Sequence, residues 1–219
     1  MKYALRGGSV ILAAILLLIA YEAVQVLRAR ANTPAILAAH ADRSVRIADL
    51  PPRRIAMLLR VEDPAFLHHH GIDWSTPGAG ATTITQGLVK RLYFDRFDPG
   101  FAKIEQSLIA WLVLDPAVGK REQVDLLLNY AWMGNQGRRP VIGFPAAALV
   151  YFGKPLARLD DRQFLGLVAM LMAPRDLDPL RHTAANAERV RRIEALLAGR
   201  CTPRDHGDVK LVGCAGISI

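Results

Sequence analysis

Apolar side chains recur every three or four residues through most of the chain, the pattern of helices that bury one face. One such helix is predicted to begin at Pro52, because proline is favoured in a helical first turn. Its apolar face holds Ile55, Leu58 and Leu59. Further helices are expected after Thr83 and over residues 101–114, 120–133, 145–152, 162–172 and 184–198. No segment sustains the alternation of a strand, so the sequence predicts a mainly α fold.

Local signals add detail to these elements. Asp160, with Gln163 three residues later, predicts a capping box at the start of the helix over residues 162–172. The helix over residues 101–114 is expected to turn an apolar stripe toward the core. That stripe consists of Phe101, Ile104, Leu108 and Trp111. Three glycines predict a flexible loop that carries Arg138 and Arg139; they are Gly134, Gly137 and Gly143.

The N-terminal segment is the most apolar part of the chain. Small and apolar residues run unbroken over residues 9–21, and the helical pattern continues to Leu27. With its flanks this run just reaches the roughly 20 apolar residues that a membrane-spanning helix needs. The alternative is a cleaved signal peptide, because residues 29–31 read Ala-Arg-Ala, like a cleavage site. That site is far from the apolar run, so we predict a retained anchor.

These patterns divide the chain into five parts. A cytoplasmic tip at residues 1–8 precedes the anchor at 9–28 and a connector at 29–48, and a globular domain follows at 49–199. The tail at 200–219 holds both cysteines, Cys201 and Cys214. An exported domain can pair them, whereas two free thiols fit the sequence equally well.

Composition and charge narrow the class of partner. Hydrophobic residues make up 52% of the chain, which agrees with a membrane segment. The formal net charge is +8, which suits an anionic membrane surface or a phosphorylated substrate. Nucleic acid is not an expected partner, because aromatic residues make up only 7% and no block of Lys and Arg stands alone.

Candidate chemistry begins where the first globular helix ends. Glu62 continues the apolar face of that helix, Asp63 follows it, and Pro64 disfavours further helix. Partial burial of Glu62 and the neighbouring charge of Asp63 both raise a carboxylate pKa, which makes a better base near neutrality. The alternative is an exposed glutamate at a helix end.

A second candidate is the glycine-rich stretch over residues 74–81, which leads into a helix capped by Thr82 or Thr83. Gln86 stands at the capping-box position after Thr83. Such a junction can bind an anion, although no Gly-Lys-Ser/Thr sequence of a P-loop is present and a plain loop–helix junction explains it equally. Residues 68–70 are three histidines, but consecutive side chains point apart, so we expect no metal site there.

Several motifs, in order over residues 55–192, resemble those of glycosyltransferase family 51, the peptidoglycan glycosyltransferases. The first motif is carried by Glu62, Asp63, Phe66, His69, Gly71 and Asp73. The second is carried by Gly80, Thr82, Thr83, Ile84, Thr85, Gln86, Lys90 and Arg91. Later motifs are carried by Lys120, Asp125, Asn129, Gly134, residues 151–154, Leu159, Gln163, Leu165 and Pro174. The length and the anchor resemble the monofunctional form.

The chain also departs from the family pattern. The R-K-x-x-E motif aligns with Ala102 and Lys103, and its acid is replaced by Glu105 one position early or by Gln106. Gly87 and Arg91 replace a glutamine and an asparagine of the second motif. Asp125 shortens the usual glutamate, and the segment from Asp73 to Gly80 is shorter than usual. A catalytically impaired descendant that binds lipid II or cell-wall synthesis proteins is therefore a second hypothesis.

The resemblance implies a lysozyme-like helical lobe with a smaller membrane-proximal lobe. It implies polymerisation of lipid II, in which Glu62 takes a proton from the acceptor hydroxyl and undecaprenyl diphosphate leaves. Lys90, Lys103 and Arg91, beside Thr82 and Thr83, are expected at the diphosphate, and Glu105 or Asp125 as a second acid. Further substrate-binding residues by this resemblance are Asp63, Phe66, His69, Gly71, Thr85, Gln86 and Asn129.

The same resemblance gives cofactors, partners and location. No cofactor is required, although a divalent cation such as Mg or Mn can accompany the diphosphate. The expected partners are lipid II, the growing glycan strand and the membrane, with cell-wall synthesis proteins as further candidates. The domain is expected on the periplasmic side of the inner membrane, held by a single span. A lysozyme-like hydrolase is a third hypothesis, disfavoured because diphosphate-binding cations serve no purpose in cleavage.

Overall fold

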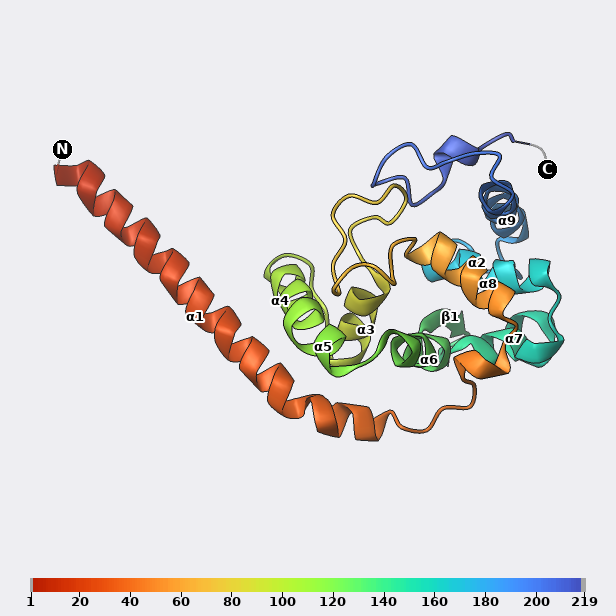
Figure 1. Cartoon of the computed structure of the whole chain (residues 1–219), viewed down its shortest axis with the longest axis horizontal. Coiled ribbons are helices and arrows are strands. Elements are labelled where there is room, and N and C mark those ends of the chain that lie inside the picture. Colours follow the sequence, from red (N-terminus) through yellow and green to blue (C-terminus); the bar gives the residue numbers. More distant parts are fainter. Residues whose placement is uncertain (1, 218–219) are drawn as a thin grey trace.

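The computed structural model describes residues 2–217, with side chains from residue 11 onward. The described chain is mainly helical, as predicted, and begins with one long apolar helix (Figure 1). Residue 1 of the predicted cytoplasmic tip and residues 218–219 of the tail lie outside the described part.

Helix α1 (Lys2–Ala39) projects from the rest of the molecule, and its part from Ile11 to Ala39 is long and apolar enough to span a membrane. The helix does not stop at residue 28, where the connector was expected, but continues to Ala39. Pro34 lies inside it, and the axis changes direction near its end (Figure 1). An interior proline removes one backbone hydrogen bond and bends a helix, which explains that change.

The last turns of α1 are docked on the domain. The Thr33 hydroxyl lies 2.9 Å from the Tyr93 hydroxyl, and Arg30 donates to the carbonyl of Leu112 at 3.1 Å. Ala29 and Thr33 are buried there. The predicted connector is therefore partly a packed helical extension of the anchor.

The core centres on α8 (Asp161–Leu171), which packs against α2 (Pro52–Glu62) and α9 (Thr183–Leu197). Every side chain from residue 164 to residue 170 of α8 is buried, so this helix is surrounded by its neighbours. The predicted capping box at its start is confirmed. The Asp160 carboxylate accepts from the Gln163 N–H at 2.8 Å, and the Gln163 side chain accepts from the Asp160 N–H at 3.2 Å.

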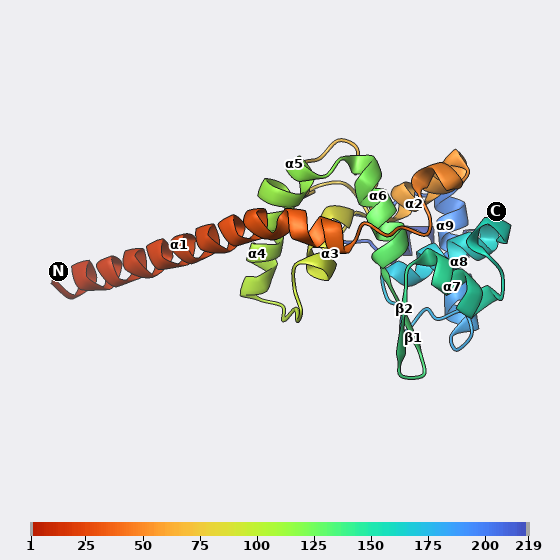
Figure 2. The same cartoon turned by 90° about the horizontal axis from the view of Figure 1, so that it is seen from below.

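A second group of helices lies beside α1 (Figures 1 and 2). It contains α3 (Ile84–Leu92), α4 (Phe101–Ile109), a π-helical segment (Ala110–Leu114) and α5 (Asp115–Ala117). Helix α6 (Lys120–Tyr130) packs on α3 and links this group to α7 (Phe144–Phe152). Short 3₁₀ turns lie at Ile47–Asp49, Leu156–Arg158 and Val212–Cys214.

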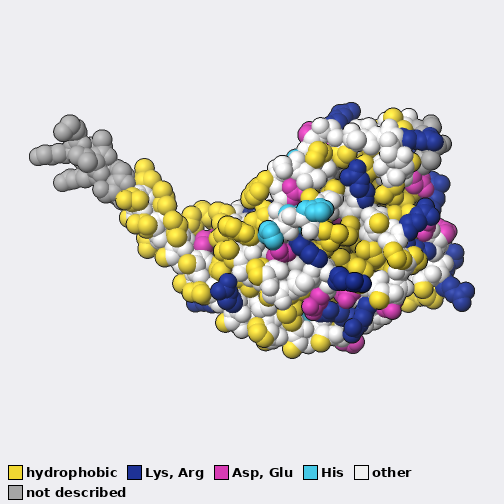
Figure 3. All heavy atoms as spheres, viewed as in Figure 1, with side chains coloured by type: hydrophobic (Ala, Val, Ile, Leu, Met, Phe, Trp, Pro, Cys, Tyr) yellow, Lys and Arg dark blue, Asp and Glu magenta, His cyan; other side chains and the backbone are white. Residues whose placement is uncertain are grey.

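The predicted inner face of the helix over residues 101–114 is wrong. Phe101, Ile104 and Trp111 are 71%, 43% and 51% exposed, whereas Gln106 and Ile109 are buried. An exposed apolar face has the same helical spacing as a buried one, so the periodicity alone does not show which way the face points. Figure 3 shows the apolar surface of α1 continuing onto the adjacent side of the domain.

The predicted flexible loop after residue 133 is also wrong, as is the extension of the preceding helix to that residue. Helix α6 ends at Tyr130, and an antiparallel hairpin follows, formed by β1 (Trp132–Gln136) and β2 (Arg139–Ile142) (Figure 2). Gly134 and Gly143 have φ of +95° and +80°, and a Cβ at either would lie within 3 Å of a neighbouring oxygen. Glycine is needed at these positions because the backbone at the base of the hairpin packs closely against its neighbours. The prediction of a flexible loop did not anticipate this packing.

Candidate active site

A cleft of about 700 Å³ lies between the two groups of helices. The end of α2, the glycine-rich loop, α3, the start of β1, the end of α8, α9 and the tail each contribute to its wall. Among the predicted site residues, Glu62, Thr82, Thr83, Lys90 and Arg91 line it. The fold thus brings the predicted base into one cavity with Lys90 and Arg91, two of the three predicted cations.

Glu62 is the last residue of α2 and is partly buried in the cleft wall. Burial raises the pKa of its carboxyl to about 7; Arg189 opposes this rise and the neighbouring Asp63 adds to it. The prediction of a partly desolvated glutamate with a raised pKa is therefore confirmed. A carboxyl that titrates near neutrality can exchange a proton with substrate at cellular pH.

Arg189 of α9 is a site residue that the sequence reasoning missed. Its side chain is 6% exposed and lines the same cleft, and its Nε and Nη1 atoms have no hydrogen-bond partner among the described residues. Burial lowers the pKa of its guanidinium, while Glu62 and Asp208 act against this. Arg189 lies four residues before the buried Ile193, and a charge on an apolar helix face is the signal that could have found it.

Cations gather on the α3 and α4 side of the cleft. Lys90 and Arg91 line it, and Lys103 of α4 donates to the Thr82 hydroxyl at 2.8 Å. Burial and the charge of Lys90 lower the pKa of the Lys103 ammonium, which indicates that the two ammonium groups repel each other. Such a cluster is stabilised by an anion with several negative charges.

The start of α3 is a fully capped junction. Thr83 is the N-cap, its hydroxyl accepts from the Gln86 N–H at 3.1 Å, and Gln86 Oε1 accepts from the Thr83 N–H at 2.9 Å. The Ile84 N–H donates to the buried Asp63 carboxylate at 2.9 Å. Because protein groups already occupy these N–H donors, the reading as a plain loop–helix junction holds, and anion binding falls to the side chains.

Several predicted binding residues lie behind the cleft wall as a buried network. Asp63 is 1% exposed, and its two carboxylate oxygens lie 2.9 and 3.0 Å from Nε2 of His69. The Thr83 hydroxyl donates to the carbonyl of Gly71 at 2.7 Å. A Cβ at Gly71 would meet the carbonyl oxygen of Ala110 at 2.5 Å. These residues position the loop and α3 from inside.

Phe66, Thr85 and Gln86 are likewise buried. The Phe66 ring packs against His69, the Thr85 hydroxyl donates to the side chain of Gln123 at 2.7 Å, and Gln86 donates to Ser107. None of the three lines the cleft among the described residues. Their contacts tie the first motif, α3, α4 and α6 together.

Three further candidates lie outside the cleft. Asp125 accepts from the N–H of Ile47 at 2.5 Å, and Asn129 bonds the backbone of Val45, so both hold the chain that follows α1. Glu105 is partly buried, and burial together with the charge of Glu22 on α1 raises its pKa. The structure therefore places both candidates for a second acid away from Glu62.

Metal-binding groups are few in the described part of the chain, where no three His, Cys, Asp or Glu side chains are arranged to hold an ion. His69 is occupied by Asp63, and His70 lies 3.7 Å from the carboxylate of Asp115. Glu62 and Asp95 are the carboxylates among the described lining residues of the cleft. An ion there would need ligands from the substrate.

Comparison with known proteins identifies the family of the chain. A family model described as Transglycosylase matches residues 75–198. The chain belongs to the transglycosylase family, glycosyltransferase family 51. The matched region begins after α2, so it includes Lys90, Arg91, Lys103 and Arg189 but not Glu62.

Individual relatives agree with this family. The chain is 30% identical over 162 residues to a biosynthetic peptidoglycan transglycosylase of Chromobacterium violaceum, covering 68% of this chain and 69% of that protein. It is 34% identical over 150 residues to a protein of the same name from Alcanivorax borkumensis, covering 63% and 59%. It is 30% identical over 160 residues to penicillin-binding protein 1B of Escherichia coli, covering 67% of this chain but only 19% of that protein.

Proposed function

We propose that this transglycosylase-family protein is a peptidoglycan glycosyltransferase that polymerises lipid II, with Glu62 as the general base. The observation that carries the proposal is the shared cleft, in which a carboxyl with a pKa of about 7 faces a wall that also holds Lys90 and Arg91. The names of the relatives from Chromobacterium violaceum and Alcanivorax borkumensis supply the reaction class.

In the proposed reaction, the 4-hydroxyl of the acceptor sugar attacks the anomeric carbon of the growing chain. Glu62 removes the hydroxyl proton as the new C–O bond forms, and the bond from the anomeric carbon to the diphosphate oxygen breaks. Arg189 favours the ionised form of Glu62 and thus its readiness as a base. General base catalysis of this kind contributes roughly 10²–10⁴-fold to rate.

The leaving group is a diphosphate, so negative charge develops on its oxygens. Lys90, Arg91 and Lys103 can stabilise that charge, and the Thr82 hydroxyl is held beside them by Lys103. Arg91 is further positioned by its bond to the carbonyl of Tyr130 at 3.2 Å. A divalent cation, if used, would arrive with the diphosphate.

The lipid substrate fits a membrane location with the domain on the outer or periplasmic face. Helix α1 can cross the bilayer, and it contacts α4, which carries the exposed Phe101 and Ile104, and the π-helical segment, which carries the exposed Trp111. The disulfide of Cys201 and Cys214 supports the side, because disulfides persist in oxidising compartments. The positive net charge suits an anionic lipid surface.

The test is polymerisation of labelled lipid II by the purified full chain in detergent. Glu62→Gln is expected to lower the rate by about 10²–10⁴-fold while lipid II still binds, because the amide cannot accept the proton. Glu105→Gln is the matched control, since Glu105 lies outside the cleft, and it is expected to retain activity within a few-fold.

Two outcomes would overturn this assignment. In the first, the wild-type protein binds lipid II but forms no polymer under conditions in which a known transglycosylase is active. The protein would then be a lipid II-binding protein and not a glycosyltransferase. Full activity of Glu62→Gln would remove Glu62 as the base.

A further inference from the structure

The C-terminal tail, residues 200–217, folds back over the glycine-rich loop at residues 74–82 (Figure 1). It follows α9 and lies beyond the region that the family model matches, which ends at residue 198. The family match therefore gives the tail no role.

Backbone hydrogen bonds join the tail to the loop. The Gly78 N–H donates to the carbonyl of Asp205 at 2.9 Å, and the Gly80 N–H donates to the carbonyl of His206 at 2.8 Å. The His206 ring adds a contact of 3.0 Å from Nδ1 to the carbonyl of Thr76. The loop, which has no regular secondary structure of its own, thus takes some of its hydrogen-bond partners from the tail.

The two loop glycines are also shaped for this contact. A Cβ on Gly78 would lie 2.7 Å from the Pro203 ring, and a Cβ on Gly80 would lie 2.3 Å from Cγ1 of Val209. Their φ angles are +80° and +68°, where other residues are strained. The close approach of loop and tail therefore depends on glycine at both positions.

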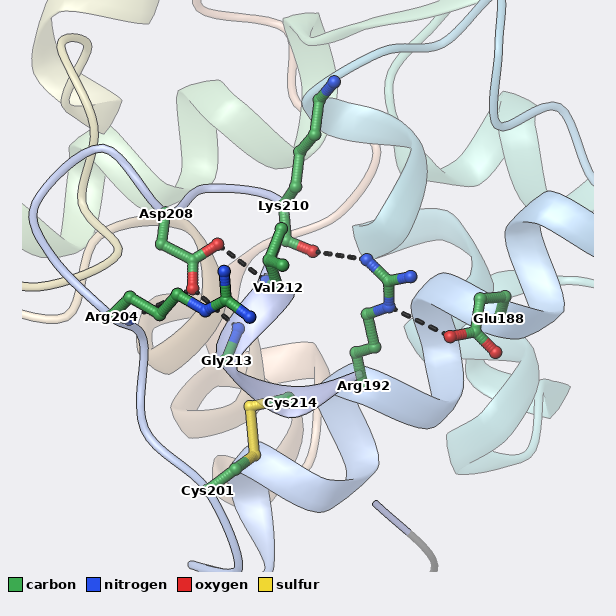
Figure 4. Close-up of a disulfide and its surroundings, with 9 residues drawn as sticks. All are labelled: Glu188, Arg192, Cys201, Arg204, Asp208, Lys210, Val212, Gly213 and Cys214. Carbon is green, nitrogen blue, oxygen red and sulfur yellow. Dashed lines mark hydrogen bonds and ion pairs between the residues drawn. A yellow bond between two sulfur atoms is a disulfide. The ribbon is translucent and has the colours of Figure 1, made fainter. Parts of the chain in front are cut away.

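The tail is itself held rigid (Figure 4). The disulfide joins Cys201 to Cys214, and the Asp208 carboxylate accepts from the N–H groups of Arg204, Val212 and Gly213 at 2.6–3.1 Å. Arg192 of α9 donates to the carbonyl of Lys210 at 3.2 Å, which ties the tail to the body. A rigid support of this kind can fix a loop that it contacts.

Loop and tail both reach the cleft. Residues 78–81 and Val209 line its wall together with Glu62 and Arg189. We propose that the disulfide-closed tail is a positioning element for glycosyl transfer: it holds the glycine-rich loop against the cleft, and Val209 completes the wall on which the bound saccharide packs. This inference rests on the proposed function.

The first experiment measures the loop directly, by hydrogen exchange of the full chain in detergent. In the double variant Cys201→Ser with Cys214→Ser, exchange in residues 76–80 is expected to rise about tenfold or more, while peptides of α8 stay protected. Unchanged exchange in the loop would overturn the proposal. This measurement needs no turnover, so it decides the positioning role even if lipid II is not the substrate.

The second experiment uses lipid II and a variant that leaves the disulfide intact. Val209→Ala is expected to raise KM for lipid II several-fold with kcat nearly unchanged, because it alters binding and not the base. Lys210→Ala is the matched control, since its side chain is exposed and its carbonyl, which Arg192 uses, remains. Equal KM values in Val209→Ala and Lys210→Ala would overturn the role of Val209.

If the cysteine variant loses protection from hydrogen exchange throughout α8, it has unfolded. The Gly80→Ala variant then tests the proposal instead. Its Cβ would strike Val209 and separate the loop from the intact tail. Faster exchange confined to residues 76–80 is then expected, and an unchanged loop would again overturn the proposal. Absence of polymer from the wild type would instead count against the proposed function alone.

Discussion

At the scale of single residues, Glu62 is held between two opposing influences. Burial in the cleft wall favours its protonated form, and the guanidinium of Arg189 favours its ionised form. The balance leaves a carboxyl that is about half ionised near pH 7, which suits a base that must both accept and release protons.

A pH profile follows from this balance. Because the pKa of Glu62 is raised to about 7, the ionised base is lost as pH falls through 7. We therefore expect kcat/KM for lipid II to fall about tenfold per unit below that pH. Rates measured from pH 5 to 8, with structure monitored by circular dichroism, test this; a flat acid limb would contradict it.

Arg189 gives a second residue-scale prediction. Arg189→Met removes the charge that holds the pKa of Glu62 down, so the acid limb of the profile should move to higher pH. Arg189→Lys keeps the charge and is the matched control, with a limb close to that of the wild type. Identical profiles for both variants would show that the charge does not act on Glu62.

The positive charge that stabilises the diphosphate leaving group should come mainly from side chains. Lys90 and Arg91 line the cleft, and Lys103 lies behind its wall, bonded to the lining residue Thr82. Chelation by EDTA is therefore expected to slow polymerisation less than about tenfold, with Mg²⁺ or Mn²⁺ restoring the difference. Complete loss of activity in EDTA would assign the charge stabilisation to a metal ion instead.

Sequence reasoning found one half of this constellation. Glu62 could be predicted from the sequence because it continues an apolar helix face only three residues beyond Leu59. Arg189 could not be predicted in this way, because its proximity to Glu62 depends on how α2 and α9 pack. No local sequence pattern encodes that packing. Asp125 and Asn129 carry motif positions but bond the chain after α1, which is also far from them in sequence.

At the scale of elements, the N-termini of two helices followed local rules. The capping boxes at Thr83 and Asp160 each depend on residues three apart, so the sequence predicts them directly. The exposed apolar face of α4 was predicted to be buried, because lipid and protein core select the same side chains. The hairpin after α6 was missed because its strands are short and begin among glycines.

The cap of α8 gives a stability prediction. Asp160→Ala removes the acceptor of the Gln163 N–H and should lower the free energy of unfolding by about 1 kcal/mol. That corresponds to a thermal midpoint about 2–4 °C lower for a chain of this size. Differential scanning calorimetry tests it against the exposed Asp176→Ala, which should leave the midpoint unchanged.

At the scale of the whole molecule, elements far apart in sequence enclose the cleft. The glycine-rich loop is backed by the tail, and the chain after α1 is pinned to α6 by Asn129. The sequence could not decide whether the cysteines pair, since their spacing permits both states. The structure joins them, 13 positions apart in sequence.

Removing this link should be measurable in the unfolding of the domain. Cys201→Ser with Cys214→Ser is expected to lower the free energy of unfolding by about 2–4 kcal/mol, because the unlinked chain gains freedom when unfolded. Denaturant titration in detergent tests this, and the reduced wild type should match the variant. A variant as stable as the oxidised protein would contradict the expectation.

The docking of α1 fixes the candidate cleft relative to the helix that is long and apolar enough to span a membrane. Helix α1 has 38 residues from Lys2 to Ala39, about 57 Å at 1.5 Å each, whereas the hydrocarbon layer measures about 30 Å. The turns where Arg30 and Thr33 contact the domain take up part of the surplus of about 27 Å. With the domain fixed to its anchor in this way, the proposed lipid-linked substrate would bind at a constant distance from the membrane surface. The glycan product would leave from the same distance.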